Sequence, residues 1–194
     1  MTGQDPTRWD GTVVLTTPRL LLRTWRLDDL PHYAALNSDL EVMRFLGGVA
    51  LTRADSDDTA AWAQDLHARE GIGLLAVERR TDGVLLGMCG LHHLDDWFPG
   101  EHEVAWRLAR AHWGRGYATE AATAWLDHGF GAMGLHRVIS VTDRDPPNVR
   151  SLGVMRRLGM VLDHDTVLTE DDGAPFAATV HSITAVQWRD HRRR

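Results

Sequence analysis

The chain has 194 residues, a length that suits one well-buried domain, because two domains of half this size would each have a small core. Its hydrophobic content of 43% and charged content of 25% are ordinary for a globular protein and favour neither disorder nor a fibre. The formal net charge of -6 argues against binding along nucleic acid, which depends on clustered lysine and arginine, and suits a cationic substrate better.

The cysteine content and the hydrophobic pattern indicate in which cellular compartment the protein is expected. Cys89 is the single cysteine, so neither an intrachain disulfide nor a cysteine-only metal cage can form. This usage fits a reducing compartment, and we expect a cytoplasmic protein. No apolar run approaches the roughly 20 residues that cross a bilayer, and the N-terminus lacks the apolar core of a signal peptide, so no membrane partner is expected.

In the first half of the chain, hydrophobic periodicity and turn residues predict both strands and helices. Thr52 and Asp55 have the spacing of a capping box, which marks the start of a helix. The turn residues Thr81, Asp82 and Gly83 separate two strands that should be antiparallel neighbours. The predicted elements are a strand over 19–25, helices over 27–38, 41–46 and from Thr52 to about His67, and strands over 73–79 and 83–94.

The second half predicts further strands separated by two helices. The order of elements is mixed: strand, helices, three strands, helix, strand, helix, two strands. Residues 1–16 and 190–194 are expected to be an N-terminal extension and a basic C-terminal tail around one domain over 17–189. The predicted elements are a strand over 102–109, a helix from the glycines at 114–116 to Gly134, a strand over 136–143, a helix over 149–158 closed by Gly159, and strands over 161–168 and 176–188.

The segment HWGRGYATEA (112–121) places two glycines one residue apart between a predicted strand and a predicted helix. Free N–H groups at a helix start attract anions, and glycine lets the backbone come close to them. The P-loop pattern does not occur, and Thr119 stands where the dinucleotide fingerprint needs its third glycine. By itself the glycine pair is consistent with either a tight turn that packs a helix or an anion site.

Three blocks in a fixed order resemble the Gcn5-related N-acetyltransferase (GNAT) superfamily, particularly its ribosomal-protein N-terminal acetyltransferase-like (RimJ/RimL-type) branch. They are TPRLLLRTWRLDD (17–29), EVAWRLARAHWGRGYATEAA (103–122) and RVISVTDRDPPNVRSLGVMRRLGM (137–160). The resemblance implies an α+β fold with a mixed, mostly antiparallel sheet of six to seven strands, about four flanking helices and splayed central strands. It also implies a monomer or a homodimer.

The resemblance further implies that acetyl-CoA binds along the strand and the glycine loop. In that family the loop amides hold the pyrophosphate, and the end of the preceding strand pairs with the pantetheine arm. The superfamily often has Gln or Arg three residues before the first glycine, where this chain has Ala111. The residues assigned to the cofactor are Leu108, Ala109, Arg110, Trp113, Gly114, Arg115, Gly116, Tyr117, Ala118, Thr119, Asn148, Ser151 and Arg157.

Glu103 is the candidate general base, directly or through water, since it matches a glutamate common in the resembled branch and lies near the start of the strand that leads to the loop. The alternative is that Glu103 lies on a solvated face and pairs with Arg107. His92, His93 and Asp95 are the next candidates. Histidines in a metal-binding pattern such as His-Glu-x-x-His do not occur, so no catalytic metal is expected.

Asn148 and Ser151 form a second group. Asn148 suits the N-cap of the following helix, which places Ser151 one turn later on the same side. In the resembled family this helix start contacts the cofactor, and the serine can protonate the departing thiolate. Many relatives use a tyrosine a few residues further along, in the region where this chain has Met155, so Ser151 inherits the role of general acid. Arg157 keeps a cation that the resemblance places near the nucleotide, although a solvated helix face also explains it.

The leading hypothesis is acetyl transfer from acetyl-CoA to a primary amine, with a protein N-terminal α-amine as the first choice of acceptor. A small amine, such as an aminoglycoside or a polyamine, remains an alternative because the segments that would form the acceptor pocket carry no specific motif. A non-catalytic acyl-CoA-binding module on the same fold is the other alternative, since fold does not determine function.

Overall fold

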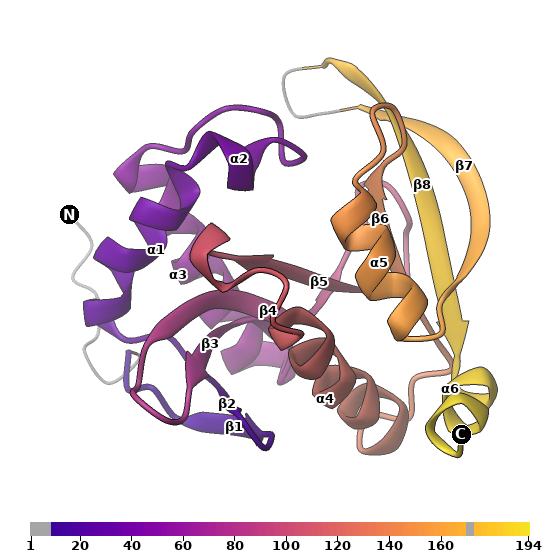
Figure 1. Cartoon of the computed structure of the whole chain (residues 1–194), viewed down its shortest axis with the longest axis horizontal. Helices are drawn as coiled ribbons and strands as arrows, with labels where there is room; N and C mark the ends of the chain where they lie inside the picture. Colours follow the sequence, from indigo (N-terminus) through magenta and orange to yellow (C-terminus); the bar gives the residue numbers. More distant parts are fainter. Residues whose placement is uncertain (1–8, 170–172) are drawn as a thin grey trace. The chain divides into compact units, whose positions relative to one another are not determined.

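Eight strands form one sheet in the order β1-β2-β3-β4-β5-β6-β8-β7 (Figure 1). The structure is a computed structural model that describes residues 9–169 and 173–194. Its chain divides into two compact units, one comprising the described residues up to Gly90 together with Trp106–Ala124, and the other comprising Leu91–Ala105 and Trp125–Arg194. No helix in the described residues is long and apolar enough to cross a membrane.

Antiparallel strands form the sheet of the first unit. β1 pairs with β2, and β2 pairs with β3 along the register Leu20↔Arg79 to Arg23↔Ala76. β1 lies inside the predicted extension 1–16, of which residues 1–8 fall outside the described part. Sequence patterns missed β1 because its four residues are only partly buried and depend on pairing with β2. The strands are β1 (Val13–Thr16), β2 (Leu20–Arg23), β3 (Gly73–Arg79) and β4 (Leu85–His93), whose last three residues belong to the second unit.

The helices of the first unit follow the predicted order. The Thr52 hydroxyl accepts from the Asp55 amide at 3.2 Å and the Asp55 carboxylate accepts from the Thr52 amide at 3.2 Å, so the predicted capping box is confirmed. The second helix was predicted over 41–46 but ends at Met43. Gly47 and Gly48 adopt a left-handed backbone conformation shortly after this single turn. The elements are the 3-10 helix η2 (Leu27–Asp29) and the helices α1 (Leu30–Asn37), α2 (Leu40–Met43) and α3 (Arg53–Glu70).

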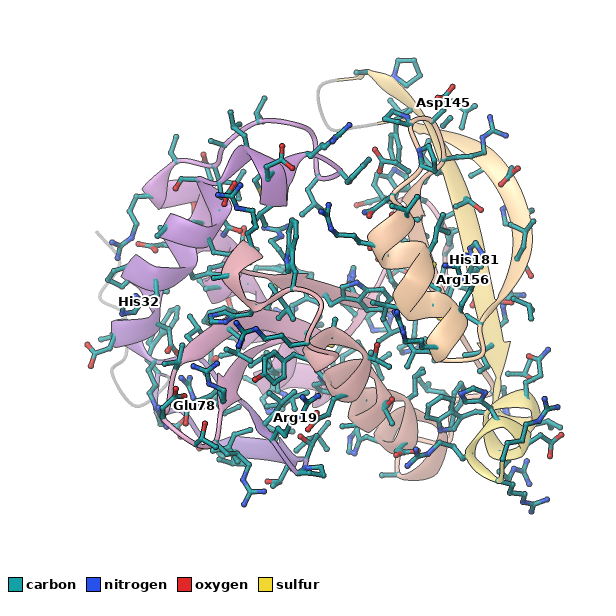
Figure 2. The ribbon with its side chains drawn as sticks, viewed as in Figure 1. Arg19, His32, Glu78, Asp145, Arg156 and His181 are labelled. Atoms are coloured by element: carbon teal, nitrogen blue, oxygen red, sulfur yellow. The ribbon has the colours of Figure 1, made fainter. Side chains whose placement is uncertain are left out.

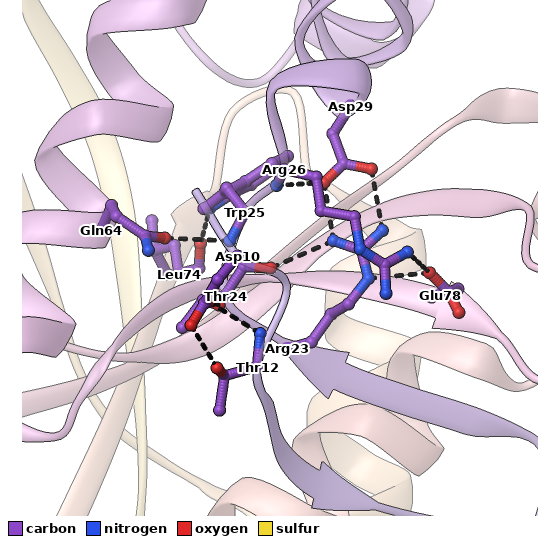
Figure 3. A network of polar contacts seen from close by, with 10 residues as sticks. All are labelled: Asp10, Thr12, Arg23, Thr24, Trp25, Arg26, Asp29, Gln64, Leu74 and Glu78. Atoms are coloured by element: carbon purple, nitrogen blue, oxygen red, sulfur yellow. Dashed lines mark hydrogen bonds and ion pairs between the residues drawn. The ribbon is translucent and has the colours of Figure 1, made fainter. Parts of the chain in front are cut away.

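A buried ionic network lies at the C-terminal end of β2 (Figure 3). The Arg23 side chain is 1% exposed and donates to both carboxylate oxygens of Asp29, at 2.6 and 2.8 Å. Its Nε donates to Glu78 at 2.7 Å, and Arg26 reaches the same Glu78 oxygen. A buried charge is tolerated only when it is paired and hydrogen-bonded, so this network fixes the chain between β2, η2 and β3.

The second unit contains the other half of the sheet. β5 pairs in parallel with β6 at Glu103↔Ile139, and β8 runs antiparallel to both β6 and β7. β7 and β8 form the long hairpin coloured orange to yellow in Figure 1. The strands are β5 (His102–Leu108), β6 (Arg137–Asp143), β7 (Val161–Thr169) and β8 (Pro175–Thr184), and the helices are α4 (Tyr117–Gly131), α5 (Val149–Arg157) and α6 (Ala185–Arg192). β5 and α4 each begin in one unit and end in the other.

The last predicted strand, over 176–188, is wrong at its end, because β8 stops at Thr184 and α6 follows. Thr184 and Gln187 form a capping box that starts the helix. Trp188 is then buried and donates from its ring nitrogen to Asp127 at 2.9 Å. α6 also continues into the predicted tail 190–194 as far as Arg192. The predicted α+β fold class is confirmed, with eight strands in place of six to seven.

We expect Asp29→Ala to lower the free energy of unfolding by about 3 kcal/mol, because the variant leaves the buried Arg23 guanidinium with half of its counter-charge. Urea denaturation measures the change. The matched control is Asp57→Ala, which breaks the exposed pair with Arg53 and should cost less than about 1 kcal/mol. Equal losses in the two variants would contradict a structural role for the network.

Candidate active site

The glycine loop joins β5 to α4. The 3-10 helix η3 (Arg110–His112) follows β5, and α4 begins at Tyr117. Gly114 has a φ of 72° and Gly116 a φ of 80°, in the left-handed region that residues with a Cβ rarely adopt. The Gly116 carbonyl accepts from the Glu120 amide at 3.0 Å, so the loop ends on the first turn of α4. The segment is exposed, which leaves the start of the helix open to an anion.

In two of the three residues predicted to pair with pantetheine, a backbone group is already hydrogen-bonded within the protein. The Leu108 carbonyl accepts from the Trp113 ring nitrogen at 2.7 Å, and the Ala109 amide donates to the Leu86 carbonyl at 2.9 Å. Gly87 makes the close approach of β4 possible, because a Cβ there would overlap the Arg107 carbonyl. The Leu108 oxygen keeps a second lone pair, whereas the Ala109 N–H is engaged with β4.

Several arginines lie near the loop, and Arg19, Arg79 and Arg110 each pair with a carboxylate. Burial first, and then the charges of Arg79 and Arg115, lower the pKa of the His112 imidazole, while the charge of Asp82 opposes them. Arg110 pairs with Asp39 at 3.5 Å, while Arg115 is exposed. Open backbone at two left-handed glycines, a helix start and these cations fit a pyrophosphate.

Glu103 lies on β5 and is buried, with 8% of its surface exposed. Its Oε1 accepts from the Val141 amide at 2.8 Å, and its Oε2 lies 3.1 Å from Nε2 of His92. The alternative of a solvated Glu103 paired with Arg107 is therefore wrong. Arg107 instead donates to the Asn37 side chain at 2.8 Å. The structure brings together two candidates that the sequence offered separately.

Hydrogen-bond geometry requires a proton between His92 and Glu103. Nδ1 of His92 lies 2.8 Å from the His93 carbonyl, which can only accept, so Nδ1 carries a hydrogen. Nε2 and a carboxylate oxygen would then both be acceptors unless one more proton lies between them. Burial by itself lowers the pKa of His92, but the hydrogen bond and charge of Glu103 outweigh it, so this pKa is raised above its usual value.

The start of α5 has the predicted cap. Oδ1 of Asn148 accepts from the Ser151 amide at 3.2 Å, which confirms Asn148 as the N-cap and places Ser151 in the first turn. Met155 is completely buried, so its side chain belongs to the core of this unit. Arg157 is exposed and donates to the Gly153 carbonyl of its own helix at 2.9 Å.

Sequence patterns did not identify a hollow of about 260 Å³ in the second unit. Arg144, Arg156, Asp165 and His181 contribute to its wall, and they come from four separate segments of the chain. None of the residues assigned to the cofactor or to catalysis lines it. Within residues 9–169 and 173–194, no cluster of three or more His, Cys, Asp or Glu side chains could hold a metal ion.

Comparison with known proteins identifies the family. The model of the acetyltransferase (GNAT) domain matches residues 19–161. The chain belongs to the GNAT acetyltransferase family. The uncharacterized N-acetyltransferase YnaD of Bacillus subtilis is similar, with 31% identity over 148 residues that cover 75% of this chain and 81% of YnaD. GNAT enzymes use acetyl-CoA, so the protein is an acetyl-CoA-dependent acetyltransferase.

Solved structures share this GNAT fold. A GNAT-family acetyltransferase from Bacillus anthracis has a TM-score of 0.76 and 23% identity, over 89% of this chain and 98% of its own. A structure assigned as a ribosomal-protein-serine acetyltransferase from Vibrio cholerae has a TM-score of 0.71 and 20% identity, over 88% and 96%. Spermidine N-acetyltransferase from Vibrio cholerae, in complex with CoA and spermine, has a TM-score of 0.70 and 18% identity, over 89% and 99%.

We expect Glu103→Gln to lower the pKa of His92 below its usual value of about 6.5, because burial then acts without the opposing carboxylate. An NMR titration of the histidine rings measures the shift, with His92→Gln to assign the signal. His181, whose pKa is already lowered by burial, is the control within the same spectra and should not move. An unchanged His92 pKa would show that the pair does not share a proton.

Proposed function

We propose that this GNAT enzyme transfers the acetyl group of acetyl-CoA directly to a primary amine, and that the acceptor is a protein N-terminal α-amine. The observation that carries the proposal is the buried pair of Glu103 and His92, which lies on β5 and β4 and provides a site for a transferable proton. β5 also leads directly into the glycine loop. One strand therefore carries both a candidate base and a candidate binding loop for the donor.

The modest basicity of the pair favours an acceptor amine that loses its proton at a small free-energy cost. Freeing an α-amine at pH 7 costs about 1 kcal/mol, whereas freeing a lysine ammonium costs about 4.6 kcal/mol. The proton already held between His92 and Glu103 reduces the capacity of the carboxylate to accept another. When that proton leaves, the pair is a neutral imidazole beside a carboxylate, and this form, with a net charge of about -1, is the base that takes a proton from the ammonium, directly or through water.

The donor side of the proposal uses the loop and the start of α5. Acetyl-CoA, when bound, supplies an acetyl thioester. Gly114, Arg115 and Gly116 would hold its pyrophosphate, with Trp113 and the first turn of α4 (117–119) beside them, and Leu108 and Arg110 would meet its pantetheine arm. Asn148 would contact the pantetheine end, Ser151 would give a proton to the departing sulfur, and Arg157 would lie near the nucleotide.

The RimJ/RimL-type branch is part of this proposal and rests on the three sequence blocks, together with the fold shared with the ribosomal-protein-serine acetyltransferase. A small polyamine is the second candidate acceptor, because the net charge of -6 favours a cation. A cytoplasmic location belongs to the same proposal, since Cys89 is the single cysteine and no intrachain disulfide can form.

A panel of amines tests the choice of acceptor. Thiol release from acetyl-CoA is measured with peptides that carry a free N-terminus, the same peptides with a blocked N-terminus, spermidine and an aminoglycoside. We expect free N-terminal peptides to give the largest kcat/KM and blocked peptides to give no acceleration. A larger kcat/KM with spermidine or the aminoglycoside would replace the α-amine by a small-molecule acceptor.

We expect Glu103→Gln to reduce turnover by about 100-fold at low pH, where the amine is protonated, and by less at high pH, where it is already free. A pH profile of kcat measures this difference. The matched control is Glu101→Gln, two residues earlier, where the side chain makes a partly exposed pair with Arg137. A profile equal to that of the parent enzyme would exclude Glu103 as the base.

A further inference from the structure

The side chain of Arg19, the arginine of the TPRL segment before β2, is labelled in Figure 2 and makes three contacts with the glycine loop and α4. Its Nη1 donates to the Arg115 carbonyl at 3.0 Å, between the two left-handed glycines. Its Nε donates to Glu120 at 2.6 Å, and its guanidinium lies 4.7 Å from the centre of the Tyr117 ring. A residue about 100 positions away in the sequence thus fixes both the loop and the first turn of the helix.

Glu120 holds this arginine in place. One carboxylate oxygen accepts from the Thr17 hydroxyl at 2.6 Å and from the Arg19 amide at 2.9 Å, while the other accepts from Arg19 Nε. Burial alone raises the pKa of Glu120, but the hydrogen bonds from Thr17 and Arg19 outweigh it and lower this pKa. Glu120 is therefore a carboxylate at neutral pH, and it satisfies the charge of Arg19 within the protein.

The bond to the Arg115 carbonyl determines the direction of an amide. The Arg115 carbonyl and the Gly116 N–H belong to one planar peptide group, and in a trans peptide they point in opposite directions. Since Arg19 holds the oxygen on its own side, the Gly116 N–H points to the other side. Left-handed glycines rotate readily, so without this bond the peptide could turn and present its carbonyl to an anion.

We propose that Arg19, locked by Glu120, is a positioning residue that keeps the Gly116 amide directed toward the pyrophosphate of acetyl-CoA. This inference rests on the proposed role of the glycine loop. Arg19 acts through the peptide, because its Nε is held by Glu120 while its Nη1 holds the Arg115 carbonyl. The TPRL segment therefore contributes to binding of the donor, in addition to leading into β2.

The neighbouring Arg80 provides a matched control. Its Nη1 donates to the carbonyls of Thr17 and Pro18 at 2.9 and 3.2 Å, so it also ties the chain before β2. Loss of Arg80 tests the structural effect of removing an arginine there. Loss of Arg19 combines this structural effect with the loss of the hydrogen bond to the Arg115 carbonyl.

The experiment compares Arg19→Gln, Arg19→Lys, Glu120→Gln and Arg80→Gln with the parent enzyme. Calorimetry gives the Kd for CoA, thermal unfolding gives Tm, and NMR follows the Gly116 amide as CoA is added. We expect Arg19→Gln to bind CoA about tenfold more weakly, a loss of about 1.4 kcal/mol, with a smaller shift of the Gly116 amide. Steady-state kinetics should show the loss in KM for acetyl-CoA rather than in kcat. Arg19→Lys should be intermediate, since one ammonium lacks the fork that reaches both partners.

Each outcome decides between distinct claims. Parent affinity in Arg19→Gln and Glu120→Gln, or an equal loss in Arg80→Gln, would overturn the positioning role. If Arg19→Gln fails to fold, Glu120→Gln decides, because it removes the carboxylate that locks Arg19 and leaves the guanidinium present. If CoA binds the parent without moving the Gly116 amide, the loop is not the pyrophosphate site, and the proposed donor site fails independently of Arg19.

Discussion

The peptide that joins Arg115 to Gly116 lies in a loop with two left-handed glycines, and in the proposed donor site its orientation determines which backbone group faces the pyrophosphate. A loop with such freedom binds tightly only if something else holds its conformation, because ordering it on binding would weaken affinity. Arg19 and Glu120 supply that restraint through charged hydrogen bonds from the far end of the sequence. The Arg23 network holds the other end of β2, so both ends of this short strand are tied by arginine.

The candidate base is also held in place by the folded chain. His92 and Glu103 are both buried, and each oxygen of Glu103 has a partner, so the pair is oriented before any substrate arrives. A base of modest strength suffices for an α-amine and is poorly matched to lysine. The chemistry of the pair and the choice of acceptor therefore support each other, although they are tested by separate measurements.

Sequence patterns predicted most of the helices and strands, because capping boxes, turn glycines and periodicity are local features that survive in the folded chain. They also placed Asn148 as an N-cap. They missed β1, which depends on pairing with β2, and they extended the last strand over α6, whose capping residues Thr184 and Gln187 follow an apolar run. They could not pair Glu103 with His92 or Arg19 with Arg115, because those contacts depend on tertiary packing that no local pattern encodes.

The affinity of Gly116→Val for CoA tests the central claim most directly. Gly134→Val is the matched variant, since Gly134 has a similar φ of 68°, follows the other end of α4 and has open space around its Cβ position. Both substitutions place a side chain on a left-handed backbone position, whereas only the first adds a side chain to the glycine loop. The account predicts that calorimetry finds CoA binding at least about tenfold weaker in Gly116→Val and close to the parent value in Gly134→Val. Equal affinities in the two variants would contradict it.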